Sequence, residues 1–238
     1  MKNSKTNLLA LLLLIVSVSS CKKVIFEAGD LTTEIRTLDE DFTEIQIDGS
    51  LDLYVGEYND DLRIEAGENI LKHVETYVQN GTLYIDEESN NFLTNKPRRV
   101  FVNASWLDKI KTKGSGDLEV NEISSDSFIL DMDGSGDSEV NFTAVNNVIL
   151  DLGGSGDCKF SGEGTSMYIG LNGSGDVNAK LFESLSAVVN INGSGDVDVY
   201  ASDDLTVNIN GSGDVSYWGN PSTTNFNVNG SGDINQIN

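Results

Sequence analysis

Basic residues are scarce in this sequence. Lys and Arg number 15 against 38 Asp and Glu, which gives a formal net charge of -23 at pH 7. A chain this acidic repels the phosphates of nucleic acids and anionic lipid headgroups, so electrostatic binding to either is not expected. The excess of acid is also explained by solubility, because charge protects a long β-protein with open ends from aggregation.

Histidine, cysteine and long apolar runs are rare as well. The lone histidine, His73, has no obvious partner in the sequence and is better explained as a surface residue than as a catalytic base. Of the two cysteines, Cys158 alternates inward with Phe160, which predicts a buried and unreactive thiol. The apolar run over residues 8–18 is too short to span a membrane, and no catalytic signature is present.

One tetrapeptide, Gly-Ser-Gly-Asp, is abundant. It occurs seven times, and successive copies are 20, 20, 19, 20, 18 and 19 residues apart. A near-constant period of this size is typical of a solenoid, in which each repeat buries its apolar face by stacking on its neighbours. The copies begin at Gly114, Gly134, Gly154, Gly173, Gly193, Gly211 and Gly230.

Apolar residues alternate with polar ones on both sides of each tetrapeptide. In one repeat Val148, Leu150 and Leu152 precede it, and Cys158 and Phe160 follow it. A period of two indicates a strand with one buried face, so each tetrapeptide is a corner between two strands. Its glycines would supply positive φ angles or close approach, and a turn-rich remainder would close the coil. The sequence therefore predicts an all-β fold, a single-stranded parallel β-helix with about 19–20 residues per coil.

The N-terminal residues are expected to lie outside this domain. Residues 1–20 combine a positive segment, an apolar run and Val18-Ser-Ser before Cys21. This pattern resembles a bacterial lipoprotein signal peptide, with Cys21 as the lipidated residue; an ordinary secretory signal is the alternative. Residues 21–40 are predicted to form a tether. The β-helix domain is predicted over 41–238, with irregular first coils over 41–113 and regular repeats over 114–238.

The irregular region begins with a degenerate repeat. Residues 42–55 place Ile45 and Ile47 inward, but Leu51 stands where the second glycine of the corner is expected. Residues 69–76 suggest a short helical or wide-turn insertion, and Asn80-Gly81 is a hairpin signal. We therefore expect strands that depart from the regular coil before residue 114.

Three stretches carry a family resemblance: residues 42–55, residues 80–85, and residues 106–110 leading into the tetrapeptide at 114–117. They are similar to the putative auto-transporter adhesin, head GIN domain family, over roughly residues 35–238. That family is of unknown function and occurs in bacterial envelope lipoproteins. The resemblance implies a right-handed β-helix and an adhesin-like role, and it supplies no catalytic residues.

The aspartates of the tetrapeptides would form a column if the coils stack in register. Carboxylates about 4.8 Å apart repel by about 0.9 kcal/mol per pair even in water, so something must offset the repulsion. Backbone N–H groups at the corner are one explanation, and Ca²⁺ ions that bridge adjacent coils are the other. The spacing departs from the calcium-binding nonapeptide, which disfavours calcium. The column comprises Asp117, Asp137, Asp157, Asp176, Asp196, Asp214 and Asp233.

A second set of polar residues faces outward just before each corner. Arrays of Asn and Asp beside an outward strip that includes Tyr168 would suit a glycan or protein ligand, whereas an Asn ladder that only satisfies itself is the structural alternative. The candidate ligand face comprises Asp131, Asp133, Asp151, Tyr168, Asn172, Asn190, Asn192, Asn208, Asn210, Asn227 and Asn229.

These patterns favour a non-enzymatic, adhesin-like envelope lipoprotein that binds glycan or protein. A polysaccharide lyase or hydrolase needs a carboxylate cluster at one place, whereas here the carboxylates recur in every coil. Arg98 and Arg99 are the basic pair that a lyase could use, so such an enzyme stays an alternative, as does a purely structural role. We expect no cofactor apart from the calcium alternative, an outer-membrane location on either face, and association of copies through the C-terminal coil.

Overall fold

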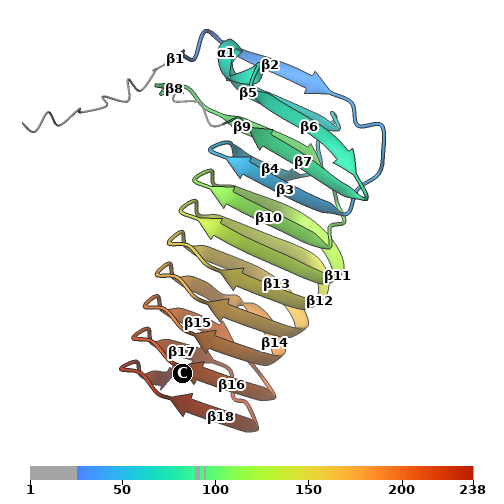
Figure 1. Cartoon of the computed structure of the whole chain (residues 1–238). Helices are drawn as coiled ribbons and strands as arrows, with labels where there is room; N and C mark the ends of the chain where they lie inside the picture. Colours follow the sequence, from blue (N-terminus) through green and yellow to red (C-terminus); the bar gives the residue numbers. More distant parts are fainter. Residues whose placement is uncertain (1–25, 89–91, 94, 238) are drawn as a thin grey trace, which may run out of the picture.

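The structure, a computed structural model, describes residues 26–88, 92–93 and 95–237. Most of the chain winds into stacked coils, and their 17 hydrogen-bonded strands form two broad faces, which we call the two sheets (Figure 1). The strands of the regular coils are β10 (Lys109–Gly114), β11 (Leu118–Gly134), β12 (Ser138–Leu152), β13 (Cys158–Leu171), β14 (Val177–Ile191), β15 (Val197–Tyr200), β16 (Asp204–Ile209), β17 (Val215–Trp218), β18 (Thr223–Val228) and β19 (Ile234–Gln236).

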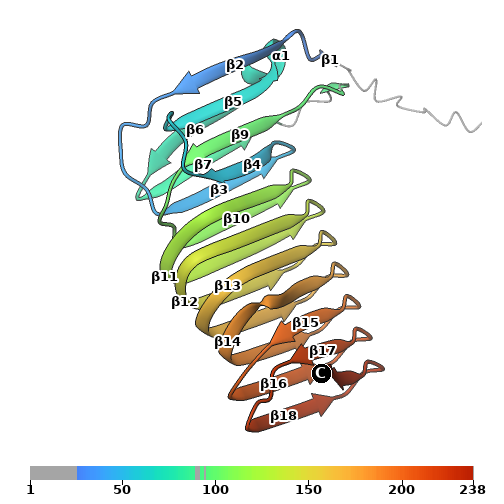
Figure 2. The same cartoon turned by 180° about the vertical axis from the view of Figure 1, so that it is seen from behind.

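Parallel pairing in register joins each coil to the next. Ile110 pairs with Leu130, Leu130 with Leu150, and Leu150 with Ile169, so equivalent residues lie above one another. The corners form one edge of the molecule, at the left in Figure 1 and at the right in Figure 2, and we call the opposite side the back edge. The predicted parallel β-helix is confirmed.

The core fills the space between the two sheets. The inward residues of the strands before β18 are buried, and four phenylalanines contact one another across coils near the back edge. Phe142 lies at their centre, 5.2 Å from Phe128, 6.5 Å from Phe160 and 5.8 Å from Phe182 between ring centroids. Coil stacking therefore buries apolar surface that no single coil could cover.

Close approach explains the corner glycines. A Cβ built on Gly134 would overlap the carbonyl oxygen of Gly114, and one on Gly136 would overlap that of Gly116. Of these corner glycines only Gly114 has a clearly positive φ, at 120°. Both glycines are therefore needed because successive corners touch backbone to backbone.

The regular coils differ from the prediction at the back edge. In β11 to β14 the closing segment stays in strand conformation, so the turn-rich residues 161–165 lie inside β13. Separate strands joined by turns occur only in the later coils, as at residues 219–222 between β17 and β18. Parallel pairing with the neighbouring coil satisfies the backbone groups that a turn would otherwise use.

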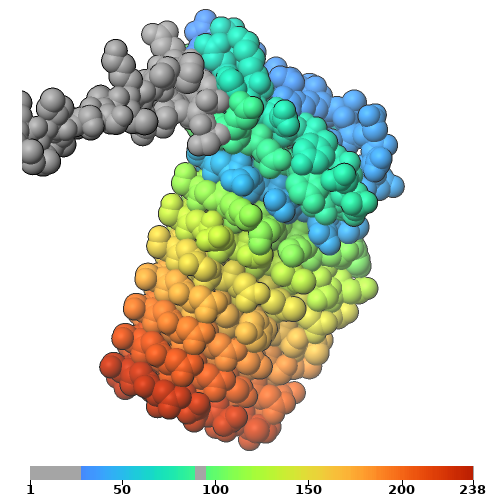
Figure 3. All heavy atoms as spheres, in the orientation of Figure 1, coloured from blue at the N-terminus to red at the C-terminus, as the bar shows by residue number. Residues whose placement is uncertain are grey.

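A cap of mixed strands precedes the regular coils (Figures 1 and 3). Antiparallel pairs join β2 to β5, β5 to β9, and β6 to β7, while β3 and β4 continue the parallel stack. The elements are β1 (Phe26–Glu27), β2 (Leu31–Arg36), β3 (Glu44–Gly49), β4 (Asp52–Gly56), β5 (Leu62–Gly67), α1 (Glu68–Leu71), β6 (Val74–Gln79), β7 (Thr82–Glu87), β8 (Phe92–Leu93) and β9 (Arg99–Asn103).

The cap corrects one expectation and confirms two. Residues 31–36, expected within a tether, form β2, because their backbone groups pair with the edge of β5 that β9 leaves open. The insertion is the short helix α1, and Asn80-Gly81 forms the hairpin turn between β6 and β7, with φ angles of 54° and 79°. Among the described residues no helix is long and apolar enough to cross a membrane.

Candidate functional site

All the predicted ligand residues lie on one of the two sheets. This sheet contains β10, the second halves of β11 to β14, β16 and β18. Three neighbouring rows of its outward side chains run along the helix axis, and we call these three rows the ladder face. The apolar row contains Ile129, Ile149, Tyr168 and Val188, the middle row Asp131, Asp151, Gly170, Asn190, Asn208 and Asn227, and the corner row Asp133, Gly153, Asn172, Asn192, Asn210 and Asn229.

The asparagines of the corner row form a continuous ladder. Asn192 Nδ2 donates to Asn172 Oδ1 at 2.9 Å, Asn210 to Asn192 at 3.1 Å, and Asn229 to Asn210 at 3.2 Å. In the middle row Asn208 donates to Asn190 at 2.8 Å. Since a side-chain amide has two N–H donors and two acceptor lone pairs, each link leaves hydrogen-bonding capacity on both residues. The ladder thus fixes the amides in place and still leaves them able to bind a ligand.

At the middle of the ladder face, Gly170 lies in the middle row and Tyr168 lies in the adjacent apolar row. Tyr168 is 38% exposed in the apolar row. A Cβ on Gly170 would lie 2.7 Å from Asp151 Oδ1 and 3.3 Å from Tyr168 Cε1. The missing side chain therefore lets the phenol ring and the carboxylate approach each other, so that an aromatic surface adjoins hydrogen-bonding groups.

Charge is distributed unevenly over the ladder face. Lys111 forms an ion pair with Asp131, which neutralises that carboxylate at the end nearer the cap. From Asn172 onwards the corner row carries only amides. Beyond Tyr168 the three rows therefore carry no charged side chain, although the exposed Asp204 lies next to them at the start of β16.

The predicted aspartate column is present and is bound by backbone N–H groups. The Oδ1 atom of each aspartate accepts the N–H of the aspartate in the next coil, as in the bonds from Asp157 to Asp137 at 2.9 Å and from Asp176 to Asp157 at 2.8 Å. The same contact extends the column back to Asp52, which accepts from Asp117 at 3.1 Å. Burial raises the pKa of Asp52, although the Asp117 N–H acts in the opposite direction.

These hydrogen bonds offset the electrostatic repulsion between the stacked carboxylates. A hydrogen bond from a backbone N–H to a carboxylate is charge-assisted and stronger than one between neutral groups. Within the described part of the chain no three acidic, histidine or cysteine side chains are grouped so that they could hold a metal ion. Calcium bridging along the column stays a prediction.

A groove of about 550 Å³ runs beside the aspartate column on the second sheet. Its lining includes Asp117, Asp137 and Asp157 together with Glu139 and Lys159, which form an ion pair of 3.0 Å. Tyr54 lies at the cap end and stacks on Phe101 with ring centroids 5.0 Å apart. Sequence reasoning did not identify this groove, because residues of the second sheet approach the column only once the coils stack.

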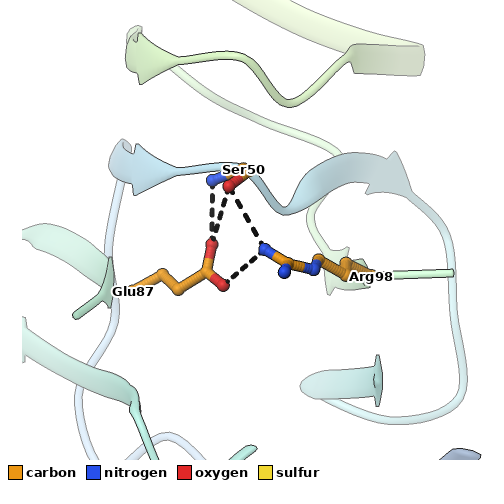
Figure 4. A network of polar contacts seen from close by, with 3 residues as sticks. All are labelled: Ser50, Glu87 and Arg98. Atoms are coloured by element: carbon orange, nitrogen blue, oxygen red, sulfur yellow. Dashed lines mark hydrogen bonds and ion pairs between the residues drawn. The ribbon is translucent and has the colours of Figure 1, made fainter. Parts of the chain in front are cut away.

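A partly buried ion pair closes the corner stack at the cap, as shown in Figure 4. Glu87 Oε2 accepts the Ser50 N–H at 2.9 Å, and Arg98 Nη1 lies 2.8 Å from Glu87 Oε1. In later coils the equivalent serine N–H donates to a glycine carbonyl of the preceding corner, as Ser135 does to Gly114. Glu87 therefore supplies the acceptor that the carbonyl of a preceding corner provides elsewhere, and Arg98 neutralises the Glu87 carboxylate.

The cap also explains why Leu51 replaces a glycine. In each regular corner the second glycine faces the backbone of the preceding corner, whereas the corner that contains Leu51 follows the cap. Leu51 is 2% exposed and joins the core. A side chain is tolerated here because no corner lies before it.

Comparisons with known proteins agree with this architecture. Residues 41–221 match the family described as "Putative auto-transporter adhesin, head GIN domain". The chain belongs to this family. A search of the curated proteins found no match.

Solved structures of other bacterial proteins share the fold of this chain. A putative adhesin from Bacteroides fragilis is 21% identical with a TM-score of 0.82, covering 89% of this chain and 100% of that one. A putative lipid binding protein from Parabacteroides distasonis is 25% identical with a TM-score of 0.70, covering 90% and 100%. A putative adhesin from Parabacteroides merdae is 20% identical with a TM-score of 0.58, covering 90% and 99%. The solved structures share the fold, and the family match supports an adhesin-like role at the cell envelope or surface.

His73 and Cys158 are the histidine and the cysteine of this head GIN domain that the structure describes. His73 does have a partner, because its Nδ1 lies 2.9 Å from Glu88 Oε2 on the surface of the cap. Cys158 is buried beside Met132, with 3.4 Å between the two sulfur atoms. Burial raises the pKa of the Cys158 thiol to about 12, so a thiolate nucleophile is strongly disfavoured there.

The two ends of the head GIN domain chain concern the predicted lipidation at Cys21 and the predicted association through the C-terminal coil. Cys21 and the signal segment lie outside the described residues. At the other end, β18 and β19 have no strand on their outer side among residues up to 237. Phe226 and Val228 point inward in register with Val207 and Ile209, yet they are 41% and 43% exposed. Association through this coil stays a prediction.

Proposed function

We propose that the protein binds an uncharged glycan through the ladder face and does so without chemistry, as an adhesin-like component of the cell envelope. The observation that carries the proposal is the fixed asparagine ladder at Asn172, Asn192 and Asn210 beside Tyr168. Ordered amides lose little side-chain entropy on binding, and an adjacent aromatic ring offers a surface for the apolar face of a sugar.

A protein ligand is the second candidate, favoured by the exposed apolar row at Tyr168. The Parabacteroides distasonis relative is described as a putative lipid binding protein, which adds a third ligand class. Two of the three rows on the ladder face are polar, however, and this favours a ligand rich in hydroxyl groups. An enzyme is disfavoured because the carboxylates repeat from coil to coil and the Arg98 guanidinium is engaged by Glu87.

The protein is proposed to reach the envelope as a lipoprotein anchored through Cys21, on either face of the outer membrane. Replacement of Cys21 by Ala should release the protein into the soluble fraction and abolish labelling with a clickable fatty acid. Protease treatment of intact cells distinguishes the two faces, since only a surface-exposed domain is degraded.

A glycan array tests the ligand. The wild-type protein should bind a set of neutral glycans, and a variant with Ala at Tyr168, Asn190, Asn192 and Asn208 should lose that binding while keeping its circular dichroism spectrum. A matched control carries Ala at Asn178, Asp198 and Ser216, which stack in register on the opposite sheet. Equal loss in both variants, or no loss in the first, would contradict the proposal.

A further inference from the structure

A hollow of about 350 Å³ lies at the back edge, where the cap meets the first coil. Three connections meet there: residues 37–43 between β2 and β3, residues 57–61 between β4 and β5, and residues 104–108 between β9 and β10. We call it the Trp106 hollow, and its lining includes Trp106, Phe42, Glu40, Asp41, Asp61 and Asn103.

Trp106 is held at the surface rather than buried. Its side chain is 46% exposed, although the next residue, Leu107, is fully buried. Its backbone bridges to Ser124, and its indole Nε1–H donates to Asp108 Oδ1 at 3.1 Å. Both ends of the residue are thus fixed, so the exposed ring is preorganised to contact a ligand.

The rest of the hollow combines an apolar floor with unneutralised acids. Phe42 and Leu38 are partly buried and pack against the core. None of the ion pairs between described residues involves Glu40, Asp41 or Asp61. Asn103 Oδ1 accepts the Tyr58 N–H at 2.9 Å, which orients the amide and leaves its N–H groups as donors.

We propose that the Trp106 hollow binds a short uncharged saccharide segment. The indole ring would contact the C–H face of a sugar ring, while carboxylates and the Asn103 amide would bind its hydroxyl groups. A volume of 350 Å³ is at the lower end of small-ligand sites and suits one or two sugar units. Three carboxylates without a cation repel acidic sugars.

This site shares a ligand class with the ladder face but does not rest on it. The hollow lies between loops of the cap, whereas the ladder face is formed by strands of the regular coils. Variants of one surface leave the other unchanged, so the two proposals fail separately.

Tryptophan fluorescence tests the inference directly, because Trp106 and Trp218 are the two tryptophans of the chain. In full-length protein carrying Trp218→Phe, the emission reports on Trp106 alone. Titration with cellohexaose, xylohexaose, mannohexaose and chitohexaose should give a saturable emission shift with at least one probe, and hexagalacturonate should give none. Asp61→Ala and Asp41→Ala should each weaken that binding by about tenfold. Glu163→Ala, an exposed acid elsewhere, is the matched control and should leave it unchanged.

Three results would overturn the inference: no saturable shift with any neutral probe, equal binding of hexagalacturonate, or unchanged affinity in both Asp variants. If Asp61→Ala fails to fold by circular dichroism, Asp41→Ala and Trp106→Phe are read by calorimetry instead. The ladder-face variant with Ala at Tyr168, Asn190, Asn192 and Asn208 should keep the Trp106 response, which separates this site from the proposed function.

Discussion

The backbone N–H of Asp137 donates a hydrogen bond of 3.0 Å to Oδ1 of Asp117, the equivalent residue one coil earlier. The contact recurs from Asp52 to Asp233, so each carboxylate ties its own corner to the next. A side chain that could be taken for a metal ligand therefore has a structural use in every coil. Five predictions test this account of the fold, its chemistry and its association.

The first concerns the aspartate column. Asp157→Ala removes the acceptor for the Asp176 N–H and should lower the free energy of unfolding by about 1–2 kcal/mol. Asp157→Asn keeps an acceptor oxygen and should lose less. Guanidinium unfolding followed by circular dichroism measures both, with Glu163→Ala as an exposed control expected within about 0.5 kcal/mol of wild type. An Asp157→Ala variant as stable as the control would contradict the structural role.

The second compares two glycines in one repeat. A Cβ on Gly156 would overlap the carbonyl oxygen of Gly136, whereas a Cβ on Gly153 would meet its nearest neighbour at 3.6 Å. Gly156→Ala should therefore destabilise the protein by about 2–3 kcal/mol or more, because two corners must separate. Gly153→Ala should be neutral or slightly stabilising. Thermal unfolding of the two variants checks this, and equal melting temperatures would contradict backbone contact at the corners.

The third concerns the cap of the corner stack. Arg98→Ala leaves Glu87, whose side chain is 4% exposed, as an unpaired charge and should cost about 3–5 kcal/mol. The double variant Glu87→Gln/Arg98→Ala should be more stable than Arg98→Ala alone, because no unpaired charge remains. Lys159→Ala breaks an exposed pair and should cost less than about 1 kcal/mol. If Arg98→Ala is as mild as Lys159→Ala in urea unfolding, the cap assignment is wrong.

The fourth concerns Cys158. Its folded-state pKa of about 12 lies above the ordinary value of 9.0, so folding favours the neutral thiol. The stability contributed by this group should be constant at lower pH and fall as the pH rises from about 9 towards 12. In a Cys21→Ser background, a thiol reagent at neutral pH should label the native protein far more slowly than the denatured protein. Rapid stoichiometric labelling of the native state would contradict burial.

The fifth concerns the outer edges of β18 and β19. Asp233 is the only charged residue in 223–237, so little repulsion opposes pairing of this edge with a second copy. We expect tail-to-tail dimers that bury Phe226 and Val228, which point inward yet are 41% and 43% exposed. Sedimentation over a wide concentration range should show a monomer–dimer equilibrium, and Val228→Lys should abolish it. A strict monomer at high concentration would rule out this association.

The regular coils were predictable from the sequence because three independent signals coincide there. The tetrapeptide spacing sets the period, the alternation around Leu150 and Phe160 sets the buried face, and the glycines mark the corners. The cap was not predictable in the same way, since the antiparallel pairing of β2 with β5 depends on contacts distant in sequence. Charged residues in 21–40 suggested a tether, although the alternation in residues 31–36 is compatible with a strand.

The rows of the ladder face were predictable from the sequence, whereas the Trp106 hollow was not. Outward asparagines follow directly from strand period and register, so the sequence alone is sufficient to name the residues of the ladder face. The Trp106 hollow combines residues 38–42, 61 and 103–106, whose proximity only the cap creates. The function of Glu87 was equally hidden, because a capping carboxylate is recognisable only beside the N–H group that it accepts.

The central claim, that the ladder face binds an intact glycan, is tested most directly by calorimetry with the highest-ranked neutral glycan from the array. The chain length of the recovered glycan is measured in the same samples. We predict saturable binding to the wild-type protein, loss of binding when Tyr168, Asn190, Asn192 and Asn208 are Ala, and an unchanged glycan length. Shortened glycan, or binding that survives in this variant, would contradict the claim.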